Sequence, residues 1–211
     1  MRYATVLCTF CLLGAALSGR GQAVPASPEA APGLPLPAAG GVAALDTGTG
    51  GTPLVVTLHA SEIAIDNHTG ANVASSAFYG NRHRGIDLDG ATATQVLPTS
   101  PPSLFVCLGQ DNRELWRSEA TIIRLKVVKD RRVAVTFSNN YFGGGLKRIM
   151  DVVPIEKSDV PNSCWLKMTP AAPLEPGEYA FVFLMKDPSF FPELIYDFSV
   201  GGAGDDTKAS K

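Results

Sequence analysis

The sequence lacks several features that would each assign a class of protein. Neither charge predominates, because 18 Lys and Arg residues stand against 20 Asp and Glu residues, so there is no basic field to attract nucleic acid. Apolar residues at helical spacing are scarce, which argues against a helical fold. Beyond the N-terminal region no apolar run is long enough to span a bilayer. We therefore expect no nucleic-acid partner and no transmembrane segment in the mature chain.

The longest apolar run lies at the N-terminus. Arg2 precedes a run over residues 4–17 whose exceptions are threonine and small residues. Its length of about fourteen residues is short of the ~20 that a spanning helix requires and is typical of a signal-peptide core. The small residues Gly21 and Ala23 predict cleavage after Ala23. We therefore interpret residues 1–23 as a signal peptide and expect a periplasmic or secreted protein.

Cysteine is also scarce, and only Cys107 and Cys164 remain once the signal peptide is removed. An even pair in an oxidising compartment is more often a disulfide than two free thiols, so we predict a bond between them. The alternative is a pair of buried thiols that pack as small hydrophobes. If both side chains point inward, the bond would join two sheets through the core, as in immunoglobulin-type domains.

Composition divides the mature chain into three parts. Residues 24–52 are almost wholly Ala, Pro, Gly, Ser and Thr. Such a composition buries too little apolar surface to offset the entropy of ordering, so it predicts a flexible leader. Residues 201–211 form a polar tail that we expect to be disordered. Residues 53–200 remain, and they suffice for one domain with its own core.

Short β-type runs separated by Gly, Pro, Asn and Asp fill residues 53–200. The clearest unit is a hairpin, because apolar side chains alternate with polar ones in residues 123–127 and again in residues 133–137. A second hairpin-like unit is predicted where Pro176 and Gly177 suit a type II turn. We count about eight or nine strands, which predicts an all-β fold with a single antiparallel Ig-like β-sandwich.

Three short elements of the chain together carry a resemblance to a set of known proteins. They are the hairpin turn at residues 129–132 (Lys-Asp-Arg-Arg), the glycine loop at 143–145, and residues 173–181 (Pro-Leu-Glu-Pro-Gly-Glu-Tyr-Ala-Phe). In them the chain resembles a loosely defined set of uncharacterised bacterial exported β-sandwich proteins. The resemblance implies export and fold, and it transfers no catalytic residue.

The sequence contains no recognisable catalytic motif. It has no serine in a glycine-flanked elbow, and the loop at 143–148 lacks the Lys-Ser or Lys-Thr pair of a phosphate-binding loop. His59, His68 and His83 lie near carboxylates, but their spacing is not diagnostic of a metal site. We therefore predict no enzyme, no cofactor and no metal. A metal-handling periplasmic protein and a small hydrolase remain as alternatives.

Aromatic pairs in predicted loops are the most suggestive feature. The six residues are Phe78, Tyr79, Tyr141, Phe142, Phe190 and Phe191. Loops carry binding residues more often than cores do, so pairs that lie at one end of the domain would form a surface for a partner. Pairs that fold back would instead cap the core. Our leading hypothesis is a non-catalytic module that binds an envelope protein or a glycan through these loops.

Overall fold

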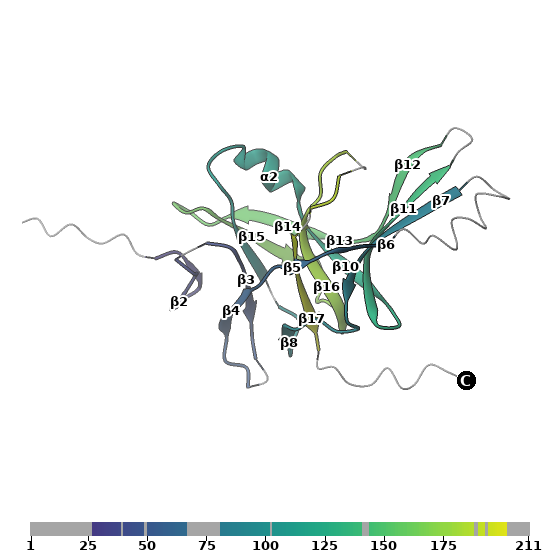
Figure 1. Cartoon of the computed structure of the whole chain (residues 1–211). Helices are drawn as coiled ribbons and strands as arrows, with labels where there is room; N and C mark the ends of the chain where they lie inside the picture. Colours follow the sequence, from purple (N-terminus) through teal and green to yellow (C-terminus); the bar gives the residue numbers. More distant parts are fainter. Residues whose placement is uncertain are drawn as a thin grey trace, which may run out of the picture.

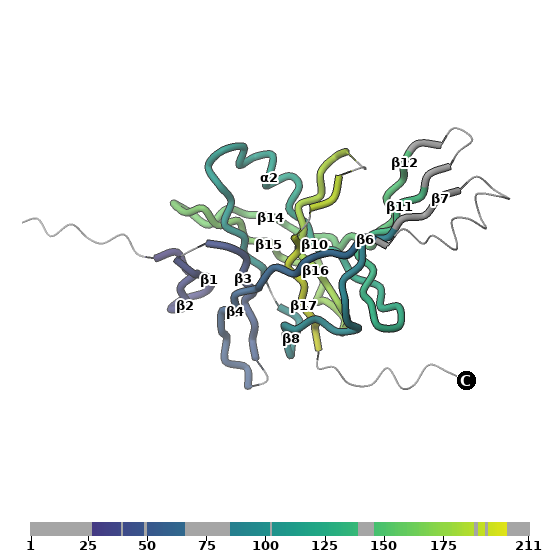
Figure 2. Tube along the Cα trace, in the orientation of Figure 1, coloured from purple at the N-terminus to yellow at the C-terminus, as the bar shows by residue number. Residues whose placement is uncertain are grey.

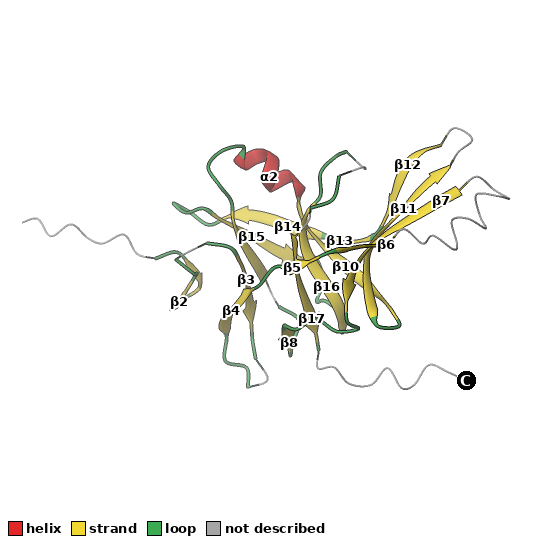
Figure 3. Ribbon diagram, in the orientation of Figure 1, coloured by secondary structure: helices red, strands yellow, loops and turns green. Residues whose placement is uncertain are grey.

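Short, mostly antiparallel strands build the protein, as the period-two pattern predicts (Figure 1, Figure 3). The computed structural model describes residues 27–38, 40–48, 50–66, 81–101, 103–140, 144–187, 190–192 and 194–201. Within these residues there is one short helix, which is too short to cross a membrane. The all-β prediction is confirmed. The predicted signal peptide, and all of the predicted tail except Gly201, lie outside the described residues.

One of the two large sheets has five antiparallel strands in the order β14-β15-β9-β3-β4 within the described chain. Their bounds are β14 (Ile155–Asp159), β15 (Trp165–Pro170), β9 (Ser103–Cys107), β3 (Val42–Asp46) and β4 (Leu54–Leu58). The helix, α2 (Arg113–Glu119), follows β9 and leads into the other sheet.

The other sheet has ten strands among the described residues, seven of them in the order β5-β17-β16-β10-β11-β7-β6. Their bounds are β5 (Ser61–Glu62), β17 (Leu194–Val200), β16 (Gly177–Phe183), β10 (Ala120–Val128), β11 (Arg131–Asn140), β7 (Asn81–Asp89) and β6 (Ala64–Asp66). Three more pair with its members: β12 (Gly144–Ile149) with β11, β13 (Asp151–Val153) with β10, and β8 (Val96–Leu97) with β17. Only Ile63 separates β5 from β6, so the chain links the two ends of this sheet, and the sheet curls into a nearly closed barrel.

The architecture therefore differs from the predicted single Ig-like sandwich of about eight or nine strands. The described residues form 17 strands, and one sheet closes nearly on itself. The physical reason is visible in β10, which pairs with three strands, β11, β13 and β16. Alternation along a strand predicts which side chains are buried, but it does not predict how many neighbours the backbone binds.

The main hydrophobic core lies between the two sheets. The five-stranded sheet contributes Val42, Ala44, Leu58, Leu104, Val106, Leu166 and Met168. The larger sheet contributes Ala120, Ile122, Tyr179, Phe181, Phe198 and Val200. The two sheets are thus packed face to face, and β10, β16 and β17 are the strands of the larger sheet that contribute these residues.

The intervening residues of the larger sheet form a second core inside the barrel. Its buried members are Ile86, Leu88, Ile123, Leu125, Ala134, Val135, Phe137, Ala180, Val182 and Ile195. The predicted hairpin at residues 123–137 is confirmed as β10 and β11, joined through Lys129 and Asp130. Its alternation is interrupted by a register shift between Val133 and Val135, which also buries Ala134.

The second predicted hairpin is wrong. Gly177 is the first residue of β16 and has φ of 154°, so the expected type II turn is not formed. In addition, β15 pairs with β14 and β9, whereas β16 pairs with β10 and β17. The segment between β15 and β16 therefore carries the chain from one sheet to the other. A Pro-Gly pair is compatible with a type II turn but does not require one, and it does not predict the partner of the strand that follows.

The N-terminal part of the domain also differs from the prediction. Residues 42–46 of the predicted flexible leader form β3, which is buried along its whole length. β1 (Glu29–Ala31) and β2 (Leu34–Pro35) pair as a small separate sheet beside it (Figure 2). The average composition of residues 24–52 concealed the local apolar sequence Val-Ala-Ala-Leu at residues 42–45. The domain therefore begins before the predicted boundary at residue 53.

A buried ionic network closes one end of the barrel. The guanidinium of Arg132 on β11 donates to the carboxylate of Asp197 on β17. It also donates to the main-chain oxygens of residues 89 and 90, at 3.0 Å in both cases. It also lies 3.7 Å from the carboxylate of Glu178 on β16. The three side chains are less than 10 % exposed, so the cation and the two carboxylates compensate one another away from water.

The same network fastens the segment that follows β7 across the barrel end. Glu178 accepts hydrogen bonds from the main-chain N–H of Ala93 at 2.8 Å and from the hydroxyl of Ser199 at 2.7 Å. Ala93 and Ser199 are themselves buried. Each oxygen of the Glu178 carboxylate therefore has a donor, as a buried carboxylate requires.

We predict that Arg132→Met lowers the free energy of unfolding by about 3–5 kcal/mol, because it leaves two carboxylates buried without their cation. Arg124→Met is the matched control, since Arg124 and its partner Glu175 are 39 % and 75 % exposed. An exposed ion pair contributes only about 0–1 kcal/mol. Urea denaturation of both variants measures the difference, and equal losses in the two would contradict the assignment.

Candidate functional site

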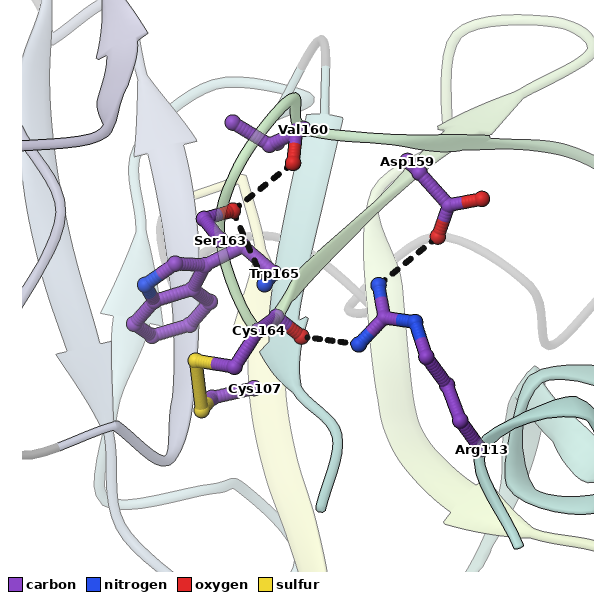
Figure 4. The surroundings of a disulfide bond; sticks show 7 residues. All are labelled: Cys107, Arg113, Asp159, Val160, Ser163, Cys164 and Trp165. Atoms are coloured by element: carbon purple, nitrogen blue, oxygen red, sulfur yellow. Dashed lines mark hydrogen bonds and ion pairs between the residues drawn. A yellow bond between two sulfur atoms is a disulfide. The ribbon is translucent and has the colours of Figure 1, made fainter. Parts of the chain in front are cut away.

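The predicted disulfide is present. Cys107 ends β9, Cys164 immediately precedes β15, and their sulfurs are bonded (Figure 4). The bond does not join the two layers, as expected from immunoglobulin-type domains, because Cys107 lies opposite Trp165 within the five-stranded sheet. It therefore links two neighbouring strands at one end of that sheet.

The loop before Cys164 is ordered by its own polar groups (Figure 4). The hydroxyl of Ser163 donates to the main-chain oxygen of Val160 at 2.8 Å and accepts from the N–H of Trp165 at 3.1 Å. Asn162 adopts a left-handed conformation with φ of 54°, which asparagine tolerates better than most residues. These contacts, together with the disulfide, hold the loop that connects β14 to β15.

Helix α2 attaches to this loop through Arg113, which sequence reasoning did not single out. Its guanidinium donates to the main-chain oxygen of Cys164 at 2.9 Å and to the carboxylate of Asp159 at 2.8 Å (Figure 4). Arg117, one turn further along the helix, lies 3.6 Å from the same carboxylate. No local pattern could reveal this, because Arg113 and Asp159 are 46 positions apart.

Lys157 of β14 binds the other end of the helix. Its ammonium donates to the main-chain oxygens of Arg117 at 2.8 Å and Ser118 at 3.0 Å, near the C-terminus of α2, where a cation is favourable. Burial, with a smaller effect of nearby Arg117, lowers the pKa of Lys157. The helix is therefore fixed at both ends against the edge of the five-stranded sheet.

A shallow pocket with a volume of about 490 Å³ lies beside the disulfide. Its polar lining comprises Gln110, Arg113, Asp159, Asn162, Ser163 and Cys164. Arg113 and Ser163 use their hydrogen-bonding groups within the chain, and Ser163 donates to a carbonyl rather than to a base. The pocket thus has no activated nucleophile, which catalysis of the serine type would require. The hydrogen bonds of Arg113 and Ser163 stabilise the loop that lines the pocket.

Of the three histidines named above, His59 is the one whose side chain the structure describes. No group of three or more His, Cys, Asp or Glu side chains able to hold a metal is found among the described residues. His59 follows β4, and its N–H donates to the carboxamide of Gln95 at 2.7 Å. His68 and the side chain of His83 are not among the parts of the chain that the structure describes.

Of the six aromatic residues predicted to bind a partner, the structure describes two, Phe190 and Phe191. Phe78, Tyr79, Tyr141 and Phe142 lie outside the described residues. Phe190 is 51 % exposed, whereas Phe191 is half-buried against the core inside the barrel. The main-chain oxygen of Phe190 accepts a hydrogen bond from Arg148 of β12 at 3.3 Å. Of this last pair, only Phe190 presents its ring to solvent.

Strands β7, β11 and β12 form an arm that projects away from the five-stranded sheet (Figure 1). At its far end Asn81, the first residue of β7, lies opposite Asn140, the last residue of β11. Asn140 in turn lies opposite Gly144, the first residue of β12. Because neighbouring strands are about 4.8 Å apart, these three backbone positions lie within about 10 Å of one another.

Comparison with protein-family models, with curated proteins and with solved structures found no match. The fold itself defines the class, an all-β protein with one disulfide among the described residues.

We predict that replacing both Cys107 and Cys164 by serine lowers the free energy of unfolding by about 2–4 kcal/mol, because the bond closes a long loop and restricts the unfolded chain. Thermal melting with and without dithiothreitol measures the effect. Reductant should destabilise the wild type and leave the double variant unchanged. A wild type whose melting is insensitive to complete reduction would contradict the prediction.

Proposed function

We propose that this protein is an exported, non-catalytic module that binds another macromolecule of the cell envelope, a protein or a glycan, through aromatic side chains at the end of its arm. The observation that carries the proposal is the register of the arm, in which Asn81, Asn140 and Gly144 are neighbours. The segment with Phe78 and Tyr79 leads directly into Asn81, and the segment with Tyr141 and Phe142 connects Asn140 to Gly144.

Two features of the arm support a binding role. Four aromatic residues lie within three sequence positions of neighbouring strand ends, and aromatic residues are enriched at the cores of protein interfaces. Aromatic side chains supply large contact areas at a low cost in conformational entropy, and they dominate the energetics of many interfaces. The arm also stands clear of the five-stranded sheet, which leaves room for a large partner (Figure 1).

Export is supported by the disulfide, because such bonds persist mainly in oxidising compartments. A non-catalytic role is supported by the pocket beside that bond, whose polar groups bind each other.

The test replaces Phe78, Tyr79, Tyr141 and Phe142 by alanine and compares the variant with the wild type. Crosslinking followed by pull-down from envelope extract, together with binding to a glycan array, should show a partner that the wild type enriches and the fourfold variant loses. Loss of two or more aromatic anchors typically weakens an interface by at least ~2 kcal/mol, or about thirtyfold.

Phe190→Ala is the matched control, since it removes one exposed aromatic ring from a different loop. It should keep the partner, and both variants should melt like the wild type. If the wild type and the fourfold variant enrich the same molecules, or if Phe190→Ala alone abolishes binding, the arm is not the binding site.

A further inference from the structure

The five-stranded sheet buries a second face, which points away from the main core. We call this the outer face, and it consists of Ala43, Leu45, Phe105 and Trp165. These residues are at most 9 % exposed, because residues 28–36, which we call the strap, cover them. The strap residues that pack there are Ala30, Ala31, Leu34 and Leu36. An aromatic and aliphatic surface is therefore filled by a proline- and alanine-rich segment of the same chain.

The strap is held on this face by side-chain packing. Its strands β1 and β2 pair with each other as a separate two-stranded sheet and do not extend the five-stranded one. The N–H of Leu36 donates to the main-chain oxygen of Pro28 at 2.8 Å, and the N–H of Gly33 donates to the carboxylate of Glu29 at 3.0 Å. Because these hydrogen bonds lie inside the strap, it can keep them wherever it docks.

A glycine turn connects the strap to β3. Gly40 and Gly41 have φ of 77° and 102°, a region that L side chains rarely adopt. The N–H of Gly40 donates a hydrogen bond to the main-chain oxygen of Pro37 at 3.3 Å. A Cβ added at Gly40 would lie 3.2 Å from the sulfur of Cys107. Docking of the strap on its own chain thus depends on a turn that favours glycine, whereas an extended linker needs no positive φ.

We propose that the outer face is an interface between copies of this chain, in which the strap of each copy docks on the outer face of the other. The backbone opens to an extended form at Gly40 and Gly41, and every contact of the strap is re-formed across a twofold axis. In the monomer the short linker holds the strap at an effective concentration of the order of millimolar, so the turn decides the balance between the two states.

The experiment shifts the equilibrium between monomer and dimer by substitutions at Gly40 and Gly41. Valine at both positions disfavours the turn and is compatible with an extended linker. Light scattering after gel filtration should give a doubled molar mass for Gly40→Val/Gly41→Val and the monomer mass for the wild type at micromolar concentration. In a Trp116→Phe background Trp165 is the single tryptophan, and it should stay equally protected from acrylamide in monomer and dimer.

Leu36→Asp, added to the valine variant, places a charge in the docked strap and should return the protein to a monomer with Trp165 accessible. Leu115→Asp is the matched control, because Leu115 is 41 % exposed on α2, and it should leave the dimer intact. A valine variant that stays monomeric overturns the proposal. A dimer that survives Leu36→Asp overturns it as well, because another surface then holds the copies together.

The wild-type chain supplies a test that does not depend on the valines. Its dimer fraction should rise as concentration approaches the millimolar range, and Leu36→Asp should abolish that rise while Leu115→Asp keeps it. A wild type that remains monomeric at several times the effective concentration of ~1 mM overturns the proposal.

Discussion

Burial of β10 on both faces is the constraint on which the rest of the structure depends. Ile122 and Ile123 are adjacent and both fully buried, one in the core between the sheets and the other inside the barrel. Its neighbour β16 repeats the arrangement with Phe181 and Ala180. Two strands therefore belong to both cores, and a change in their register would disturb both at once.

The barrel interior is apolar in its middle and ionic at one end. Arg132, Asp197 and Glu178 close that end and fasten the segment around Ala93. A buried ionic group of this kind is costly to form and still more costly to break, because each charge needs its partners away from water. We interpret the network as a device that selects one register for β11, β16 and β17.

Three peripheral surfaces differ in how far contacts within the chain already occupy them: the disulfide end of the five-stranded sheet, its outer face and the arm. Around the disulfide, Arg113 binds Asp159, and Arg113 and Ser163 each donate to a main-chain oxygen. These contacts stabilise that end of the sheet. The outer face is filled by the strap through side-chain packing and a glycine turn. The arm ends in three neighbouring strand termini. Binding is therefore expected at the arm, and exchange between copies at the outer face.

Local patterns predicted the parts of the structure that depend on neighbouring residues. The alternation in residues 123–137 predicted the β10–β11 hairpin, and the pair Cys107 and Cys164 predicted the disulfide. Helix α2 was missed because seven residues are too few to show a helical period clearly. The buried strand β3 was missed because its four apolar residues lie in a stretch of Pro, Ala and Gly.

By itself the sequence determined the all-β class of the protein, the hairpin of β10 and β11 and the pairing of the cysteines. Tertiary structure alone decided the near-closure of the larger sheet, the position of the disulfide within one sheet, the docking of the strap and the meeting of the arm's strand ends. The physical reason is that side-chain alternation is a property of one strand. Strand partners are chosen by backbone hydrogen bonds between distant segments, and any strand can form those bonds with many others.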